Sequence, residues 1–415
     1  MSRRSRDDQT PTAPSTGSED GEPAVHEHSV EELQSALAKD SLVSLLVNNH
    51  DDDAGVFLPY HNGHLDFNTY LQIVLQIQFD EDHGAPYWQE VAAELSFDPR
   101  EAINGFDDLS KLPVADETAL KTRPVTDFMP QLFSAEQIDL SKSSGTTGTK
   151  KIMPWRRTVS EDMARWYEWN VSQRDTGDGD WLVVGPYGLY EKHLEGAANR
   201  CGGFCHFTAI EPKGLKHQLK ALESGIESPW RLLDPRTSLP AIKGVIRMRA
   251  TREAAVDDLR SQPIEHIASA VPFVKQFHDI LSAAETVSAP EDIRTILLSG
   301  TNINEEDLGM LAELYPNASL IPMYATSFSG VAFSTPATDD IAYYPMAPVT
   351  LFDVIDPTTG ETMAFGERGR VVIHRVGEDF FWPNQRERET AICMPPPDNS
   401  AVEWSGIAEV KPLEA

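Results

Sequence analysis

The sequence predicts an α/β protein with a largely parallel sheet, followed by a region made mostly of β-strands. Beyond residue 140, short apolar runs alternate with helical patterns, and this rhythm is typical of βαβ units. From about residue 341 onward, strand-like runs follow one another instead. The chain is also long enough for a large core, since 40% of its 415 residues are hydrophobic.

The N-terminal part is expected to begin with a disordered tail over residues 1–28. This polar, low-complexity stretch cannot bury enough apolar surface to offset the entropy lost on ordering. A helix is expected to start with Ser29 as its N-cap, and residues 65–80 carry a broad apolar face at helical spacing. Residues 106–130 are expected to be extended connections, because prolines punctuate them.

The α/β core is expected to contain the following strands and helices beyond residue 140. Short apolar strands are expected at residues 181–185, 293–299 and 320–323. Helices are expected at residues 214–225 and 304–315, the second with Asn304 as its cap.

The β-rich region is expected to contain strands at residues 349–355, 369–374 and 379–382, with a turn at 357–360. The predicted domain organisation is therefore a tail over residues 1–28, an α/β core over 29–340, and a β-rich subdomain over 341–415 that completes this core.

Charge and composition exclude several functions. The chain has 35 basic and 65 acidic side chains, a formal net charge of −30, so nucleic acid and anionic membrane surfaces are not expected partners. No apolar run approaches the ~20 residues of a membrane span. The twin arginines near the N-terminus precede polar residues rather than an apolar export signal, and a cytoplasmic location is predicted.

Residues 142–151 (KSSGTTGTKK) form the segment that predicts chemistry. Two glycines allow close backbone approach to an anion, hydroxyl side chains flank them as donors, and lysines end the segment. These features predict a phosphate-binding loop, although the Walker pattern is not met. The alternative is a hydroxyl-rich surface turn, since such residues are common in loops.

This segment resembles the phosphate-binding loop of the adenylate-forming enzymes, which include acyl-CoA synthetases, luciferase and non-ribosomal adenylation domains. Lys150 stands where these enzymes have proline, and Lys151 takes the position of their lysine. Further similar segments follow in the expected order, at residues 298–301 (LSGT), 324–328 (YATSF) and 381–391 (FWPNQRERETA).

A short branch of this superfamily, the adenylating enzymes linked to phenazine antibiotic biosynthesis, is more similar, and acyl-protein synthetases are more distant. The similarity extends over about residues 65–415 and includes segments 185–188, 200–204 and 405–410. The resemblance implies the large N-terminal core of these enzymes. Their mobile C-terminal lid is expected to be absent, because the chain ends at Ala415.

The resemblance also implies the reaction. A carboxylic acid, expected to be an aromatic acid of a natural-product pathway, would be activated by ATP as an acyl-adenylate, with release of pyrophosphate and with Mg²⁺ as cofactor. The expected partners are the small-molecule acid and an acceptor thiol, amine or carrier protein, and a homodimer is left open.

The resemblance assigns roles to individual residues. The catalytic residues would be Lys151, Thr147 and Ser327. The nucleotide would be bound by Ser143, Ser144, Gly145, Thr146, Gly148, Gly300, Thr301, Tyr324, Thr326, Arg386 and Glu389. The acid would be bound by Tyr187, Gly202 and Gly203, on the expectation that they follow strand ends facing the site.

Each of these assignments has a structural alternative. Gly202 and Gly203 would serve equally well in close packing, Tyr324 in the core, and Arg386 and Glu389 in a solvated charged run. Phe328 also stands where these enzymes carry a Mg²⁺-binding glutamate, and Glu389 where they carry a ribose-binding aspartate.

Two other functions stay open. Phe328 and the missing lid are compatible with a catalytically reduced nucleotide-binding partner that needs another subunit. Acyl transfer through a cysteine, in the manner of acyl-protein synthetases, would use Cys201, Cys205 or Cys393. A metal site is not expected, because Cys201 and Cys205 with His206 lack a second ligand pair, and His61 and His64 share a predicted loop.

Overall fold

The computed structural model describes residues 67–143, 150–174, 177–210, 251, 253–283, 286–300, 303–336, 341–398 and 404–413. The helices are α3 (Phe67–Gln78), α4 (Pro86–Glu94), α5 (Pro99–Ala102), α6 (Ala119–Thr122), α7 (Arg157–Ser172), α8 (Leu189–Arg200), α11 (Val271–Leu281) and α12 (Glu305–Leu314). Shorter 3-10 turns lie at Asp107–Lys111, Val125–Phe128, Ala135–Gln137 and Pro290–Asp292.

Among these residues the strands form a hairpin-like pair and one large sheet. They are β1 (Ile138–Lys142), β2 (Ile152–Arg156), β3 (Asp180–Gly185), β4 (Cys205–Ala209), β5 (Ile264–Ser269), β6 (Thr295–Leu298), β7 (Ser319–Thr326), β8 (Gly330–Ser334), β9 (Ala342–Tyr344), β10 (Thr350–Ile355), β11 (Arg368–Val376), β12 (Phe381–Met394) and β13 (Gly406–Pro412).

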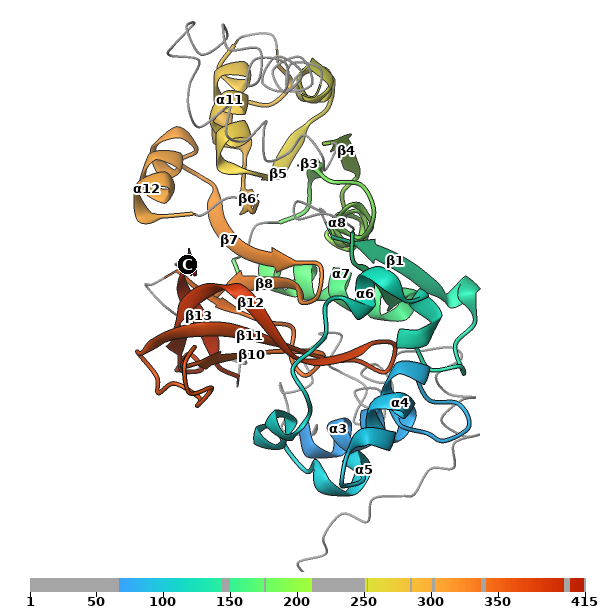
Figure 1. Ribbon diagram of the computed structural model, residues 1–415. Coiled ribbons are helices and arrows are strands. Elements are labelled where there is room, and N and C mark those ends of the chain that lie inside the picture. Colours follow the sequence, from blue (N-terminus) through green and yellow to red (C-terminus); the bar gives the residue numbers. More distant parts are fainter. Residues whose placement is uncertain are drawn as a thin grey trace, which may run out of the picture.

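The large sheet is parallel in one half and antiparallel in the other. Its 11 strands run in the order β10-β11-β12-β13-β9-β8-β7-β6-β5-β3-β4. Strands β4, β3, β5, β6 and β7 pair with one another in parallel. All the other neighbours in the sheet, which are β7 with β8, β8 with β9, β9 with β13, β13 with β12, β12 with β11 and β11 with β10, pair antiparallel. Figure 1 shows β7 running from the parallel half into the antiparallel half.

Alternating side chains of the parallel strands enter two separate cores. On β3, Val183 belongs to the core that includes residues of α7 and α8, while Leu182 and Val184 belong to the core with α11 and α12. Leu297 and Ile296 divide in the same way on β6. Because successive strand residues point to opposite faces, the parallel sheet is covered by helices on both sides.

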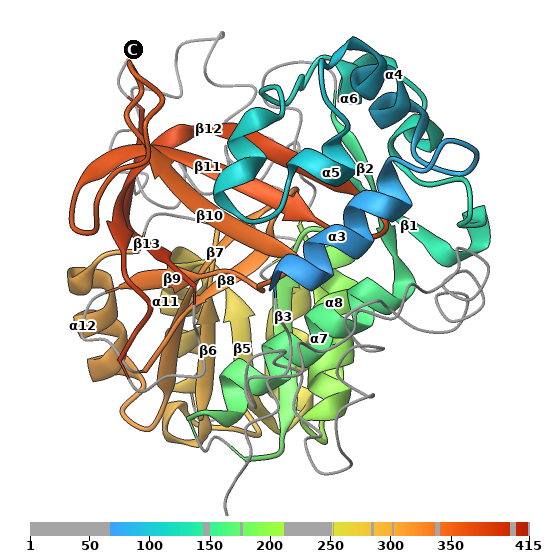
Figure 2. The same cartoon turned by 90° about the horizontal axis from the view of Figure 1, so that it is seen from below.

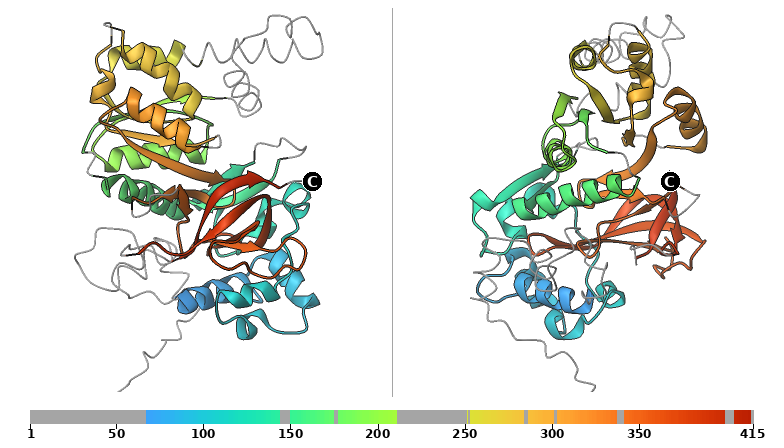
Figure 3. Two further views of the ribbon diagram at one scale, coloured as in Figure 1. Left: turned by 90° about the vertical axis from the view of Figure 1, so that its left-hand side faces the viewer. Right: turned by 180° about the vertical axis from the view of Figure 1, so that it is seen from behind.

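The N-terminal helices pack against the antiparallel half, as Figure 2 shows for α3 and α5 beside β10–β12. The Tyr70 hydroxyl donates a hydrogen bond to the Val376 carbonyl at 2.6 Å, and the Trp88 indole donates to the Phe381 carbonyl at 2.8 Å. In both views of Figure 3, the antiparallel strands (red) lie between these helices (blue) and the gold and orange helices of the parallel half.

Several predicted elements are confirmed. The helix expected at 65–80 is α3, the strands expected at 181–185 and 293–299 are β3 and β6, and the helix expected at 304–315 is α12. Asn304 caps α12, since its side chain accepts a hydrogen bond from the Asp307 amide at 2.8 Å.

Other expectations differ from the structure. Residues 106–130 are not simply extended, because α6 and two 3-10 turns lie between the prolines. The antiparallel half begins with β8, ahead of the change expected at residue 341. The expected tail at 1–28, the helix at Ser29 and the helix at 214–225 lie outside the described residues. Of the described helices, none has both the length and the apolar character needed to cross a membrane.

Candidate active site

A cavity of about 710 Å³ lies at the carboxyl ends of the parallel strands β3 and β7. The turn after β3 (186–190) lines it, as does the turn after β7 (326–328). Residues 140–143 and 150–151, which flank the predicted phosphate-binding loop, line it as well. The carboxyl edge of a parallel sheet is where α/β proteins bind ligands, so this cavity is the candidate active site.

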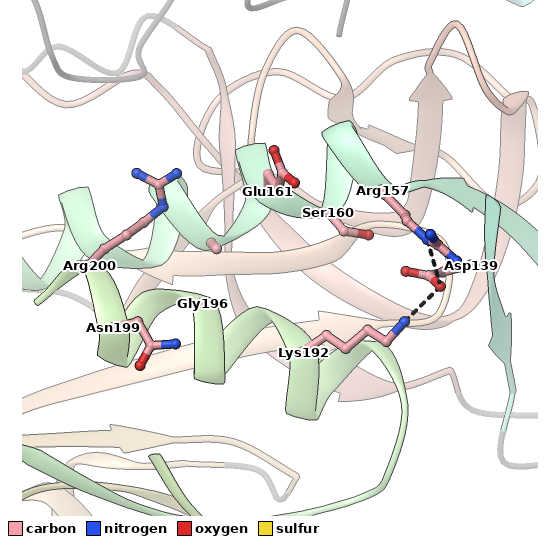
Figure 4. A pocket seen from close by; sticks show the side chains of 9 residues that line it. Asp139, Arg157, Ser160, Glu161, Lys192, Gly196, Asn199 and Arg200 are labelled. Atoms are coloured by element: carbon pink, nitrogen blue, oxygen red, sulfur yellow. Dashed lines mark hydrogen bonds and ion pairs between the residues drawn. The ribbon is translucent and has the colours of Figure 1, made fainter. Parts of the chain in front are cut away.

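A second hollow, of about 520 Å³, lies between α7 and α8 and is shown in Figure 4. Three of its charged groups pair with one another: Asp139 lies 2.6 Å from the Lys192 ammonium and 3.7 Å from the Arg157 guanidinium. No predicted site residue that the structure describes lines this hollow, so we do not assign the reaction to it.

Lys151 is anchored at the mouth of the predicted loop. Its ammonium lies 3.1 Å from a Glu117 carboxylate oxygen and 4.5 Å from the centre of the Phe328 ring. Its backbone amide donates to the Ser143 hydroxyl at 2.9 Å, and the Ser143 amide donates to its carbonyl at 3.0 Å. Through these two bonds Ser143 and Lys151 lie side by side at the cavity.

Burial raises the pKa of Glu117, but hydrogen bonds from Lys151 and Gln385 outweigh this and lower the pKa overall. The Gln385 amide donates to the same Glu117 carboxylate at 2.7 Å. Glu117 is therefore an ionised partner that holds the Lys151 ammonium in place, and strand β12 supports this pair from behind.

The turn after β7 presents hydroxyl groups to the cavity. The Thr326 hydroxyl oxygen accepts hydrogen bonds from the backbone amides of Phe328 and Ser329, at 3.1 and 3.0 Å. Thr326 thus fixes the turn, while Ser327 lines the cavity beside it. Phe328 is buried and offers an aromatic face to Lys151 rather than a metal ligand.

Glu387 on β12 is a cavity residue that the sequence analysis did not identify. Burial raises its pKa from the usual 4.5 to about 7, and Glu389 and Glu117 add to the rise while Lys151 opposes it. Its Oε1 atom is buried and has no hydrogen-bond partner within the described part of the chain. A buried, unpaired carboxyl group beside a lysine in a cavity marks a functional site.

Glu389, which the resemblance assigns to ribose, is paired with Tyr324. The Tyr324 hydroxyl donates to Glu389 Oε2 at 2.6 Å, and burial followed by the Glu389 charge raises the tyrosine pKa well above its usual range. The Tyr324 ring packs near the rings of Tyr343 and Phe352, at 6.0 and 5.9 Å between centroids. Neither Tyr324 nor Glu389 lines the cavity directly.

The structure places Arg386 away from the cavity. Its guanidinium lies next to Gly360, in the turn after β10, where a Cβ added to the glycine would be 3.8 Å from Nη2. Glu387, rather than Arg386, is the charged β12 side chain at the cavity, since successive residues of a strand point to opposite faces.

Gly300 follows β6 with a φ of 83°, a conformation that favours glycine. It does not line the cavity, but its neighbour Ser299 has its hydroxyl 3.5 Å from the Tyr190 hydroxyl, and Tyr190 does line the cavity. The remaining predicted loop residues lie outside the described residues; they are Ser144, Gly145, Thr146, Thr147, Gly148 and Thr301.

Tyr187 lines the cavity, whereas Gly202 and Gly203 do not. These glycines precede β4 and therefore lie at the opposite edge of the sheet from the cavity. A Cβ at Gly203 would come within 1.7 Å of the Gly179 carbonyl oxygen, so close backbone packing explains this residue. The expectation that the pair follows a strand end is corrected.

Aromatic side chains form another part of the cavity wall. Trp155, Tyr167, Tyr190 and His193 all line it, and the His193 ring lies 5.7 Å from the Trp155 ring. Gly185 allows this packing, because a Cβ there would be 2.2 Å from the Tyr190 ring. The cavity therefore combines hydroxyl and lysine groups with a flat, apolar surface.

The cysteines are not placed for catalysis. Burial raises the pKa of Cys201 to about 11 and that of Cys205 to about 12, so both stay thiols at neutral pH. Neither these two nor Cys393 lines the cavity. His206 contacts Asp180 at 3.2 Å, and within the described ranges no three His, Cys, Asp or Glu side chains are placed to share a metal ion.

The fold is similar to that of solved acid–CoA ligase structures. The structure is similar to an open form of 2-hydroxyisobutyryl-CoA ligase in complex with 2-HIB-AMP and CoA, with a TM-score of 0.59, 12% identity, and coverage of 82% of this chain and 72% of the ligase. For the same ligase in its thioesterification state the TM-score is 0.62 at 14% identity, and the match covers 84% of this chain and 68% of the ligase.

A third structure of that ligase, in the postadenylation state, gives a TM-score of 0.60 at 12% identity and covers 82% of this chain. This chain spans 65% of the ligase's length in that comparison. No family model and no curated protein sequence matches the chain. The likeness therefore lies in the fold.

Proposed function

We propose that this protein uses ATP to activate a carboxylic acid as an acyl-adenylate, with release of pyrophosphate. The observation that carries the proposal is the position of Lys151. It closes a loop rich in glycine and hydroxyl groups, at a cavity that also contains the Thr326–Ser327 turn and an aromatic wall. The ligase structures with the same fold contain an acyl-adenylate, which supports this reaction.

In this reaction a carboxylate oxygen of the acid bonds to the α-phosphorus of ATP, and the bond between that phosphorus and the bridging oxygen to the β-phosphate breaks. Pyrophosphate carries away the electron pair, and no proton has to move. The protein has to hold the two anions in line and compensate the developing charge.

Lys151 is suited to compensate this charge, because its ammonium is already held at the cavity by Glu117. Ser143 and Ser327 would donate hydroxyl hydrogen bonds to phosphate oxygens, and Lys142 and Lys150 add positive charge to the same wall. Thr326 keeps the turn after β7 in shape, because its side-chain oxygen is used by two backbone amides.

Mg²⁺ is included in the proposal because ATP and the protein, with its net charge of −30, are both anionic. The ion would supply charge compensation on the phosphates. Glu387 is the one acidic side chain among the described residues lining the cavity, and carboxylate oxygens are ligands that Mg²⁺ accepts. The donor set therefore fits, although Phe328 provides no ligand.

The proposed substrate is an aromatic acid of a natural-product pathway, such as phenazine biosynthesis, and the aromatic wall supports the ring. A thiol is the proposed acceptor, since the ligases of the same fold bind CoA. The alternative, a nucleotide-binding partner with reduced catalysis, is favoured only by Phe328.

Mass spectrometry tests the proposal most simply. The protein would be incubated with ATP, Mg²⁺ and a panel of aromatic and aliphatic acids, with hydroxylamine to trap activated acyl groups. Acyl-hydroxamate and AMP should form with at least one acid. ATP binding without AMP formation for every acid would favour the reduced partner instead.

A further inference from the structure

A bulge between Trp382 and Gln385 interrupts strand β12. Trp382 lies opposite Arg375 of strand β11. Gln385 lies opposite Ile373, so two residues of β12 face a single residue of β11. In a regular strand, residues three positions apart point to opposite faces. Here the two side chains meet on the same side, and the Trp382 indole donates a hydrogen bond to Gln385 Oε1 at 3.0 Å.

The hydrogen bonds of Gln385 fix which way its amide group points. An indole nitrogen can only donate, so the amide oxygen of Gln385 must face Trp382. The amide nitrogen then faces Glu117 and donates to its Oε1 atom at 2.7 Å, and the Lys151 ammonium lies 3.1 Å from the same oxygen. Direct contacts therefore form a relay that runs from Trp382 through Gln385 and Glu117 to Lys151.

The bulge also holds the chain segment that carries Glu117. Asn384 lies within the bulge with a φ of 58°, which is uncommon for a residue other than glycine. Its side-chain amide donates to the carbonyls of Leu109 and Leu112 at 2.7 and 3.0 Å, and its own carbonyl accepts from the Ala115 amide at 3.4 Å. Such a conformation, held in place by its surroundings, is typical of functional sites.

The other end of the relay is anchored in the core. Trp382 is fully buried, and its ring packs near the rings of Phe380, Tyr87 and Phe128, at 5.5 to 5.7 Å between centroids. Gln385 is buried as well. Neither Gln385 nor Glu117 lines the cavity, so the relay reaches the cavity through the lysine at its end.

We propose that this relay positions Lys151 for charge compensation, and that Gln385 and Glu117 are positioning residues of the adenylation reaction. The inference rests on the proposed function, because it names residues that act through the lysine of that reaction. A lysine ammonium ends a flexible four-carbon stem, so it has to be held in place before the reaction begins. A misplacement of about 1 Å can lower a rate by about 100-fold.

Acetylation of Lys151 by acetic anhydride, followed by mass spectrometry of its peptide, tests the relay without turnover. An ammonium that hydrogen-bonds a carboxylate has to give up that contact before its amine reacts. In Glu117→Gln and in Gln385→Leu, Lys151 should react roughly 10-fold faster than in wild type, since a hydrogen bond to a charged group is typically worth that much. Lys192, which pairs with Asp139 at the other hollow, should react at an unchanged rate.

Acid-dependent pyrophosphate exchange into ATP tests the catalytic consequence. In both variants the rate at saturating ATP and acid should fall roughly 10-fold or more, because the lysine is no longer held in position. The KM for the acid should not change, because neither residue lines the cavity. The double variant Glu117→Gln/Gln385→Leu should lose no more than Glu117→Gln alone, because Gln385 acts through Glu117.

Gln78→Leu is the matched control. Gln78 is also fully buried, and its amide donates to the carbonyls of Gly377 and Glu378 at 3.0 Å, but these bonds are not part of the relay. This variant should keep the wild-type acetylation of Lys151 and the wild-type exchange, and melting curves of all the variants report their folding. Because the Glu117 side chain is 26% exposed, Glu117→Gln should fold even if Gln385→Leu does not.

The results separate the inference from the proposed function. The inference would be overturned by wild-type acetylation of Lys151 in the folded variants, by wild-type exchange in them, by losses that multiply in the double variant, or by equal losses in Gln78→Leu. If the variants expose Lys151 to acetylation but the wild-type protein exchanges pyrophosphate with no acid, the relay to Lys151 is supported and adenylation is refuted.

Discussion

Glu387 gives the most quantitative prediction, because its pKa differs so much between the folded and unfolded chain. In the folded protein burial raises this pKa from 4.5 to about 7. A carboxyl group with a raised pKa binds its proton more tightly in the folded state, so it stabilises the fold at low pH. That contribution is lost as the pH rises from about 4.5 through 7.

The size of the effect follows from these two values. One pKa unit corresponds to about 1.4 kcal/mol, so the full loss is about 3 kcal/mol, most of which falls between pH 5 and pH 8. Glu387→Gln keeps the shape of the side chain but cannot ionise. The free energy of unfolding of this variant, relative to wild type, should therefore rise by about 2–3 kcal/mol from pH 5 to pH 8.

Urea unfolding of both proteins at pH 5, 6, 7 and 8 measures this difference, and titrations common to both cancel. Glu409→Gln serves as a control, because a hydrogen bond from Lys411 lowers the pKa of Glu409 and this group therefore titrates below the range tested. Its difference from wild type should stay nearly constant from pH 5 to pH 8. A Glu387→Gln curve that is equally parallel to wild type would contradict the prediction. A variant that loses stability relative to wild type at high pH would show that Lys151, rather than burial, controls this group.

Three further predictions concern neighbouring parts of the structure. Gly203→Ala should lower the free energy of unfolding by about 2–3 kcal/mol, because the added methyl group overlaps the backbone. The KM for the acid should not change, and a changed KM would show that this glycine contributes to the acid site. Tyr324→Phe should cost about 1.5–3 kcal/mol in unfolding free energy, because Glu389 loses a hydrogen bond, and a cost near zero would contradict the pairing. Intact mass after incubation with ATP and acid should show no acyl adduct on Cys205, whose pKa burial raises to about 12, and an adduct there would support acyl transfer through cysteine.

The sequence predicts the parallel half of the fold where local patterns and packing agree. Strands β3 and β6 are continuous apolar runs because both of their faces are buried, and α12 carries its own cap in Asn304. The pattern of apolar residues does not predict helix α7, because its buried face includes the polar residues Asp162 and Asn170. The helix supplies partners for both: Asp162 lies 3.2 Å from the Arg165 guanidinium, and the Asn170 amide donates to the Trp166 carbonyl at 2.8 Å.

The same distinction applies to the site. The predicted phosphate-binding segment is contiguous, so its glycines, hydroxyls and lysines are visible in one stretch, and Ser143 and Lys151 lie together at the cavity. Glu387 stands in a run of alternating charges, and the sequence alone does not say which of them turns inward. The packing of β12 in the folded sheet places Glu387 at the cavity.

Trp155 and His193 illustrate the remaining gap. They lie on β2 and α8, which are far apart in sequence, and neither belongs to a motif. Only the packing of α8 across the cavity brings their rings together. In the sequence a lone tryptophan and a lone histidine are ordinary core residues, and only the structure shows that they line one cavity.

Acid-dependent exchange of labelled pyrophosphate into ATP reports the proposed adenylation step itself. We expect exchange by the wild-type protein and a loss of roughly 100-fold or more in Lys151→Met, since transition-state charge is no longer compensated. Exchange should be nearly unchanged in Lys192→Met, a matched lysine at the other hollow. Exchange that is absent with every acid, or equally fast in Lys151→Met, would contradict that step.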